Sequence, residues 1–154
     1  MYTGTISGGK TTNGNGGSIF ITGSNSAMNM YGGLVTGGYA GTGAQQRSGG
    51  NIYVASNSKL QIVDDPAIAG KPMVTDGETQ ANNGGNIYYG GKTLLIDGAE
   101  ITGGTAPGQG NDLYIATTGA VIKGVSVCGD AVAKVAADIS GLDTLADFKI
   151  TFLS

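Results

Sequence analysis

Apolar residues recur along this chain in short alternating runs separated by glycines, at intervals of 26 to 34 residues. An apolar residue, any residue and a second apolar residue open most intervals, and such alternation is typical of a strand with one buried face. The second apolar positions are Met1, Met30, Ile62, Ile96, Ile122 and Phe148. We therefore expect a repeat protein whose units begin near these residues, the sixth of them incomplete.

Two further lines of apolar residues run in step with the first. About five residues after each opening residue comes the second line, which comprises Ile6, Val35, Ile68, Ile101, Val127 and Leu153. All but the last precede a corner glycine by two residues, at Gly8, Gly37, Gly70, Gly103 and Gly129. The third line comprises Ile19, Ile52, Ile87, Leu113 and Ile139. Each unit is therefore predicted to contain three short strands and three corners.

A unit of this size cannot bury its apolar face alone and must stack on copies of itself. The pattern predicts an all-β fold, a single-stranded right-handed parallel β-helix of about five coils of 26–34 residues with three short strands per coil. We take residues 1–154 as one domain. The chain opens on a strand position and stops inside one, so we expect a fragment of a longer protein whose ends meet flanking coils or further copies.

Length differences between the units mark the predicted loops. They lie between the second and third strands, so residues 38–48 and 71–83 are expected to form neighbouring loops on one edge of the stack. Residues 130–147 are richer in alanine and can form a helical turn at 131–137. They keep the repeat, with Asp138 and Ile139 in the third strand and Phe148 opening the next unit, so we interpret them as a degenerate fifth coil.

Composition and charge exclude several classes of function. The chain has 30 glycines, 12% charged residues, a net charge of −3, a single arginine and no histidine, so nucleic acid is not expected as a partner. No 18-residue apolar run and no basic, then apolar, N-terminal segment occur, so neither membrane insertion nor a signal peptide is predicted. The single cysteine, Cys128, cannot form an intramolecular disulfide, and we interpret it as a small residue in the slot of Thr102.

Two recurring stretches carry a resemblance to a known family. They are Gly4-Thr5-Ile6-Ser7-Gly8-Gly9 and Gly49-Gly50-Asn51-Ile52-Tyr53-Val54. The pattern resembles the right-handed parallel β-helix (pectate-lyase-like) repeats of bacterial secreted and cell-surface adhesin-like proteins. The resemblance implies an extracellular or cell-surface location and a structural or adhesive module. It leaves two alternatives open: a β-helix polysaccharide lyase or glycoside hydrolase, and a filament subunit that polymerises end to end.

An aromatic stripe is the strongest candidate for a binding surface. Each of its members follows the buried Ile or Leu of the third strand, so alternation turns it outward; they are Phe20, Tyr53, Tyr88 and Tyr114. Exposed rings in a row bind the apolar faces of sugars, which makes a polysaccharide or host glycan the candidate ligand. The alternative is that the rings stack on one another and stabilise the sheet.

A polar line precedes the third strand in each unit. It comprises Ser18, Asn51, Asn86, Asp112 and Asp138. Side-chain amides stacked from coil to coil can hydrogen-bond to one another, so we interpret this line as a structural ladder.

Two groups of acidic residues are candidates for chemistry. Asp64, Asp65 and Asp97 fall near one corner and form a weak candidate Ca²⁺ site, but the interpretation that we favour is solvated turn residues partly neutralised by Lys123.

Asp76 and Glu78 lie in the longest predicted loop, opposite the loop that bears Arg47. Paired carboxylates can hydrolyse glycosides, and this trio is also a candidate ligand site. Because histidine is absent, the usual serine or cysteine triad is excluded. The sequence therefore predicts neither an enzyme nor a cofactor.

Overall fold

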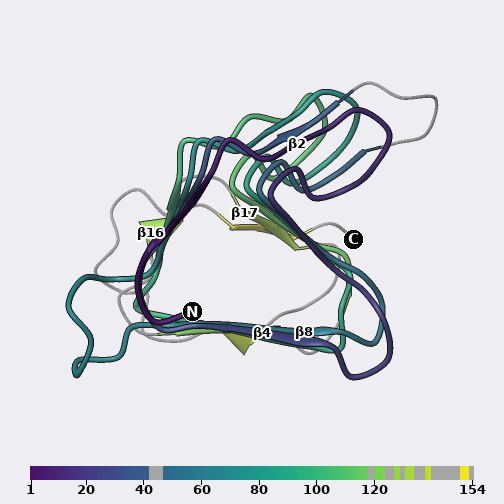
Figure 1. Ribbon diagram of the computed structural model, residues 1–154. Helices are drawn as coiled ribbons and strands as arrows, with labels where there is room; N and C mark the ends of the chain where they lie inside the picture. The colour runs from purple at the N-terminus through teal and green to yellow at the C-terminus, as the bar shows by residue number, and fades with distance from the viewer. Residues whose placement is uncertain are drawn as a thin grey trace.

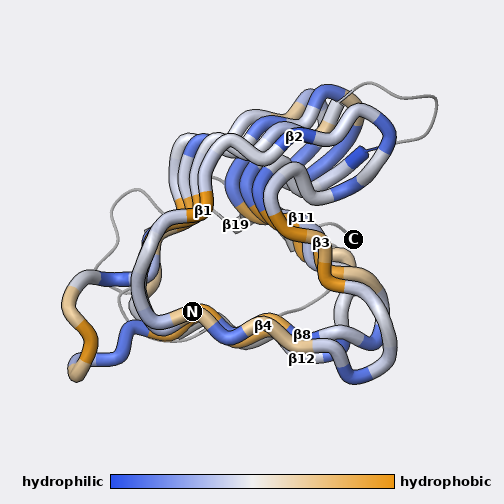
Figure 2. Tube along the Cα trace, in the orientation of Figure 1, coloured by the Kyte–Doolittle hydropathy of each residue, from blue (hydrophilic) through white to orange (hydrophobic). Residues whose placement is uncertain are grey.

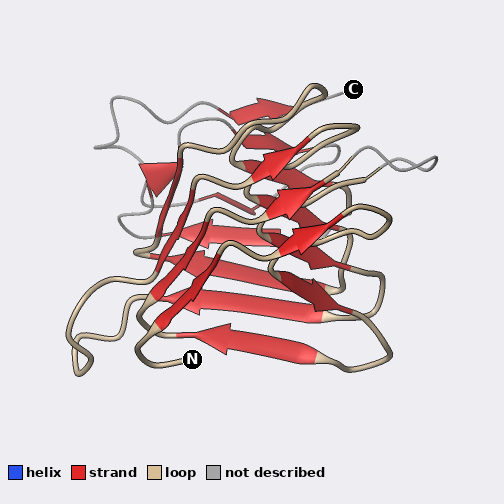
Figure 3. Ribbon diagram, turned by 45° about the horizontal axis from the view of Figure 1, so that its top comes forward, coloured by secondary structure: helices blue, strands red, loops and turns tan. Residues whose placement is uncertain are grey.

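The structure is a computed structural model that describes residues 1–41 and 47–117 with their side chains. It also describes the backbone of five later strands between residues 120 and 152. Across these residues all regular structure is β, with 19 strands and no helix (Figure 3). Every strand pairing is parallel. The predicted all-β, parallel architecture is confirmed at this level.

The strands form four sheets, which the chain visits in the same order in each of its first three turns. We call them sheets A, B, C and D, in the order in which the chain first enters them. Each strand pairs with the strand that follows it by one turn of the chain, so the turns lie one above another. Figure 1 looks along this stack, and the successive turns superimpose on a three-sided outline with a lobe at one corner.

Sheets A and B form one side of the outline and the lobe. Sheet A contains, in spatial order, β1 (Thr5–Ser7), β5 (Leu34–Thr36), β9 (Met73–Thr75), β13 (Glu100–Thr102) and β16 (Val127–Cys128). Sheet B lies in the lobe and contains β10 (Glu78–Thr79), β6 (Tyr39–Ala40) and β2 (Lys10–Thr11).

Sheets C and D form the other two sides. Sheet C contains β19 (Ile150–Phe152), β17 (Ala131–Ala133), β14 (Leu113–Ile115), β11 (Ile87–Tyr89), β7 (Ile52–Val54) and β3 (Ile19–Ile21). Sheet D contains β18 (Asp138–Ile139), β15 (Ala120–Lys123), β12 (Thr93–Asp97), β8 (Lys59–Val63) and β4 (Ala27–Met30).

The core fills the three-sided space between sheets A, C and D. Alternation along each strand sends one set of side chains inward, and Figure 2 shows apolar segments on all three sheets. The inward set comprises Val35, Val74 and Ile101 from sheet A, Ile52, Ile87 and Leu113 from sheet C, and Leu60, Leu94 and Ile96 from sheet D. Each fully buried side chain of this kind stabilises the fold by about 1.5–3 kcal/mol. The three apolar lines of the sequence are thus the three walls of the core.

Sheet B is an element that the sequence analysis missed. It lies between the predicted second and third strands, where only loops were expected. Its strands have two residues each, and Thr105 extends it by a single bridge to Glu78. The Lys10 ammonium lies 4.7 Å from the centre of the Tyr39 ring, across neighbouring strands. The first three turns therefore have four short strands each, where the sequence predicted three.

The third unit is longer at a different corner from the one predicted. Val35 pairs with Val74, and Thr36 with Thr75, so in the third unit Asp76 occupies the corner that Gly37 occupies in the second. The sequence pattern predicts Gly70 at this corner. Residues 64–72 instead form an extra loop between β8 and β9, seen in teal at the lower left of Figure 1. The prediction failed because Ile68-Ala69-Gly70 imitates the motif with a half-exposed isoleucine.

The register of the last strands also differs from the prediction. Ile139 pairs with Ile122 in sheet D, and the third-strand place after Leu113 belongs to Ala131, with which Ile150 pairs in turn. Asp138 is therefore not a continuation of the polar line, and Ile139 rather than Phe148 follows Ile122. Residues 131–133 are a strand, not a helical turn. Cys128 pairs with Ile101, one residue from the predicted slot, and Phe148 lies outside the described residues.

Candidate functional site

The aromatic stripe is a continuous stack of rings on the outer face of sheet C. Its members are the central residues of β3, β7, β11 and β14, which pair directly. Neighbouring ring centres are 5.4, 4.8 and 5.4 Å apart, from Phe20 through Tyr53 and Tyr88 to Tyr114. Tyr53 and Tyr88 are parallel to within 5°. We call these four residues the aromatic stack, and their predicted alignment is confirmed.

In the aromatic stack the face of each ring packs against the neighbouring ring. Tyr53 and Tyr88 each have a ring on both sides, so what they present to solvent is an edge and a hydroxyl group. Burial raises the pKa of both phenols, and for Tyr88 the neighbouring Tyr53 and Tyr114 raise it further. Phe20 is 54% exposed and Tyr114 only 7%. A sugar ring therefore finds no free face on the two central tyrosines, and the arrangement supports mutual stabilisation.

A second column, of buried polar side chains, runs through the neck between the lobe and the core. Asn51 Nδ2 donates to Asn86 Oδ1 at 2.8 Å, and Asn86 Nδ2 donates to Asp112 Oδ1 at 2.9 Å. Both asparagines are fully buried. We call Asn51, Asn86 and Asp112 the asparagine column. The ladder predicted from the sequence is confirmed at these three positions.

The asparagine column also ties together the two chain segments that form the neck. On one wall, the backbone N–H groups of Gly38, Gly77 and Gly104 donate to the three side-chain oxygens at 2.7–2.8 Å. The backbone carbonyls of Thr75 and Thr102 accept hydrogen bonds from the two amide groups. Each asparagine therefore joins two turns and both walls, and its side-chain oxygen accepts a glycine N–H that backbone pairing leaves over.

Glycine pairs beside the asparagine column permit this close approach. A Cβ atom on Gly50 would lie 2.2 Å from the Gly85 carbonyl oxygen and 2.3 Å from the Glu78 nitrogen. Gly17 and Gly85 are equally crowded by backbone atoms of the neighbouring turn and of the lobe. The Gly-Gly pairs of the sequence are thus required by the contact between sheet B and the start of sheet C.

The first member of the predicted ladder lies at the edge of this network. Ser18 Oγ is buried without a hydrogen-bond partner. Ser18 stands before β3, where the following turns have Asn51 and Asn86. Its hydroxyl is too short to make the two-way contacts of an asparagine amide.

Arg47, Asp76 and Glu78 do not form the predicted cluster. Arg47 is only 9% exposed, and its carbonyl oxygen accepts a hydrogen bond from Thr79 Oγ1 at 2.7 Å. Asp76 is a corner residue with φ of 56°, and its carboxylate accepts a hydrogen bond from Thr36 Oγ1 at 3.3 Å. Glu78 lies in β10 and accepts from Gln80 Nε2 at 2.5 Å. Among the described residues neither carboxylate pairs with Arg47, so their placement favours three separate local roles.

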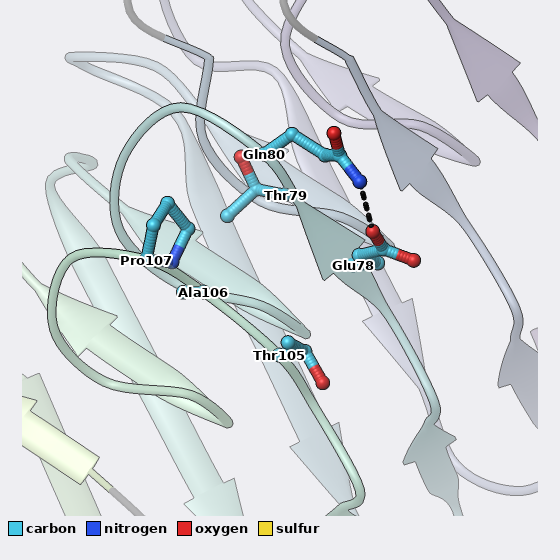
Figure 4. Close-up of a pocket in the computed structure, with 6 residues that line it drawn as sticks. All are labelled: Glu78, Thr79, Gln80, Thr105, Ala106 and Pro107. Atoms are coloured by element: carbon cyan, nitrogen blue, oxygen red, sulfur yellow. Dashed lines mark hydrogen bonds between the residues drawn. The ribbon is translucent and has the colours of Figure 1, made fainter.

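A shallow hollow of about 260 Å³ opens on the lobe beside Glu78. It is lined by Glu78, Thr79, Gln80, Thr105, Ala106 and Pro107 (Figure 4). The Thr79 hydroxyl already donates to Arg47, so the Glu78 carboxylate, the Gln80 amide and the Thr105 hydroxyl are the polar groups at its rim. Sequence analysis missed Gln80, Thr105 and Pro107 because the bridge between Thr105 and Glu78 that joins the two segments has no sequence pattern.

The three aspartates considered for Ca²⁺ do not converge. Asp97 pairs with Val63 and Lys123, one residue out of step with Asp64. The Asp65 carboxylate accepts a hydrogen bond from the Ala67 backbone at 2.9 Å and so closes a turn of the extra loop. Within residues 1–41 and 47–117 no three acidic or sulfur ligands come close enough to hold a metal ion. The weak Ca²⁺ candidate therefore gains no support from the described residues.

Comparison with known proteins gives no match: no family model fits the chain, and no curated protein or solved structure was found to resemble it. In the described part of the chain no helix is long and apolar enough to span a membrane. What the structure offers for function is therefore the aromatic stack, the asparagine column and the hollow on the lobe.

Proposed function

We propose that this chain is a right-handed parallel β-helix of about five coils that serves as a rigid structural module. Support for the architecture comes from the recurrence of sheets A, C and D in the same order from β1 to β18, with every strand pairing parallel. Support for the structural role comes from the contacts that the stacked rings and the buried amides make. The aromatic stack and the asparagine column both connect one turn to the next.

The asparagine column is the observation that carries this proposal. A buried amide in a binding site leaves donors or acceptors for a ligand, whereas Asn51 and Asn86 each direct both polar atoms to backbone or to the next side chain. Buried polar networks with all members satisfied rigidify a fold. Such a module suits a spacer or stalk that holds other parts of a protein at a fixed distance.

The proposed setting is a bacterial secreted or cell-surface protein, on the resemblance of the Gly-Gly-Asn-Ile-Tyr-Val stretch. The proposed role is not enzymatic, because Asp76 and Glu78 are engaged in separate hydrogen bonds. Incubation with pectin, alginate and host glycans tests this. Release of unsaturated or reducing sugar that is lost in Glu78→Gln would overturn the structural role.

Hydrogen exchange of the full chain tests the structural role directly. A rigid module predicts slow exchange in β7, β8, β11 and β12, which lie inside their sheets, with protection lost together in urea. The control is the loop at residues 64–72, which is expected to exchange rapidly. Fast exchange in the inner strands would contradict the proposal.

A second candidate function, saccharide binding, is favoured by the hollow on the lobe. Its lining includes a carboxylate, an amide and a hydroxyl, and Ala106 and Pro107 add apolar surface against which a sugar can pack. Glycan-array binding followed by calorimetry separates the two surfaces. Loss of binding in Glu78→Ala, with binding kept when Tyr53 and Tyr88 are both changed to Phe, supports the hollow, and the reverse result would place the ligand on the aromatic stack.

A further inference from the structure

Tyr53 and Tyr88 are the closest and most nearly parallel pair of rings among the described residues. Their centres are 4.8 Å apart and their planes differ by 5°. They are the central residues of β7 and β11 and pair directly in sheet C. Because the two side chains leave neighbouring strands in the same direction, each ring carbon of Tyr53 lies about one strand spacing, ~4.8 Å, from its counterpart in Tyr88.

Both phenols reach solvent while their rings are held by the stack. Each side chain is half-buried and has a neighbouring ring against each face, so the part of it that remains open to solvent is its outer edge. The chain has no tryptophan and no histidine to compete as oxidation targets, and it has only one cysteine. A one-electron oxidant that meets this surface therefore finds two adjacent phenols.

We propose that Tyr53 and Tyr88 form an oxidative cross-linking site at which a carbon–carbon bond joins the two rings between adjacent turns. The oxidant is a haem peroxidase driven by hydrogen peroxide. Each phenol loses one electron and its hydroxyl proton, and the two radicals couple at the Cε carbons beside the oxygens. The hydrogen on each coupled carbon then moves to its oxygen, which restores both phenols. Hydrogen peroxide takes up the two electrons and two protons and becomes two molecules of water.

The other rings explain why this pair is preferred. Phe20 has no hydroxyl and covers one end of the stack, while Tyr114 is nearly buried and its plane is tilted by 24° from Tyr88. Tyr89 points into the core from the same strand. Tyr2 and Tyr31 also stack, at 5.2 Å and 29°, but their rings are farther apart and less parallel, and neither residue lies in a strand.

The bond would act as a covalent staple between turns. It closes the segment from Tyr53 to Tyr88, and such closure stabilises a fold mainly by restricting the unfolded chain. A chain with one cysteine cannot obtain this effect from an intramolecular disulfide. The inference is independent of saccharide binding and concerns only how adjacent turns are held.

Treatment of the dilute, folded full chain with horseradish peroxidase and limited hydrogen peroxide tests the site. The expected product is a monomer lighter by two hydrogen atoms, whose tryptic digest joins residues 48–59 to residues 60–92. Its urea midpoint is expected to exceed that of the untreated chain. Tyr53→Phe and Tyr88→Phe keep a ring in the stack but remove the phenol, so each should abolish the joined peptide.

Tyr89→Phe and Tyr2→Phe are the matched controls, and each should retain the joined peptide at the wild-type yield. Tyr89 is in the same tryptic peptide as Tyr88, so this control identifies the coupled ring. Three outcomes would overturn the site: a joined peptide that survives Tyr88→Phe, coupling only between different molecules, or oxidation of other tyrosines without any joined peptide.

Discussion

Asn51 Nδ2 lies 2.8 Å from Asn86 Oδ1, and this contact joins two turns of the chain inside the neck of the molecule. Both side chains are inaccessible to solvent, and each also binds backbone groups on the opposite wall. The repeat therefore transmits its register through side-chain amides as well as through strand pairing. Substitutions in the asparagine column should therefore change the stability of the fold, as substitutions in the apolar core do.

Replacement of Asn86 by Leu should lower the free energy of unfolding by about 2–4 kcal/mol. The buried Gly77 N–H would lose its acceptor, and the Asn51 amide, the Thr102 carbonyl and the Asp112 carboxylate would each lose one of their hydrogen bonds. Urea denaturation measures the change. Asn13→Ala, at an exposed bend, is the control and should stay within about 0.5 kcal/mol of the wild type. Equal stability of the two variants would mean that the column does not support the fold.

Tyr89→Phe should raise the free energy of unfolding at neutral pH by about 1 kcal/mol. The Tyr89 hydroxyl is buried in the core without a hydrogen-bond partner, so its removal eliminates an unpaired donor. Tyr53→Phe, at the solvent edge, should change stability by less than about 0.5 kcal/mol. A clear loss of stability in Tyr89→Phe would show that the hydroxyl finds a partner in solution.

Alkaline pH should destabilise the fold partly through the same residue. Burial raises the pKa of Tyr89 above its ordinary value of 10.0, so the folded chain keeps a proton that the unfolded chain releases. Stability is then fully present below pH 10 and falls as the pH rises above it. Between pH 9 and pH 11 the wild type should lose about 1.4 kcal/mol more than Tyr89→Phe. Parallel stability curves for the two proteins would contradict the shift.

Gly50→Ala should be far more damaging than Gly37→Ala, although both are glycine replacements at the neck. A Cβ on Gly50 meets backbone atoms at 2.2 Å, which cannot move without displacing sheet B, so a loss above about 3 kcal/mol is expected. A Cβ on Gly37 would meet only the Gly8 nitrogen, at an ordinary 3.8 Å, but the φ of 63° means that alanine there costs about 1–2 kcal/mol of backbone strain. The melting temperatures of the two variants provide the test. A greater loss of stability in Gly37→Ala would refute the close approach of backbone atoms to Gly50.

Ile87→Ala should leave a cavity between Ile52 and Leu113 in the core wall of sheet C, at a cost of about 2–5 kcal/mol. Ile68→Ala, in the extra loop, should cost less than about 1 kcal/mol because this side chain lies outside the stacked sheets. The denaturation midpoint of each variant provides the measurement. A larger loss of stability in Ile68→Ala than in Ile87→Ala would support the alignment predicted from the sequence, in which Ile68 belongs to the core.

The sequence alone determined that the strands stack in parallel, most of the core, the aromatic stack and the asparagine column. Residues at equivalent places in successive turns meet the same environment, so Ile52, Ile87 and Leu113 repeat, and so do the rings and amides beside them. Strand alternation then decides which side of the sheet each residue takes. The stack of Tyr53 on Tyr88 and the ladder of Asn51 on Asn86 follow from periodicity alone.

Only the tertiary structure decided how the turns differ from one another. The extra loop at 64–72 breaks the period, and Val74 replaces Ile68 because pairing with Val35 buries it, a preference that local sequence does not express. Sheet B depends on a contact between lobe and neck, for which two-residue strands carry no periodic signal. The separation of Arg47, Asp76 and Glu78 likewise depends on which loop surface each residue packs against. The period of the sequence encodes the features that every turn shares, whereas packing between turns decides the features that belong to one turn only, such as the extra loop.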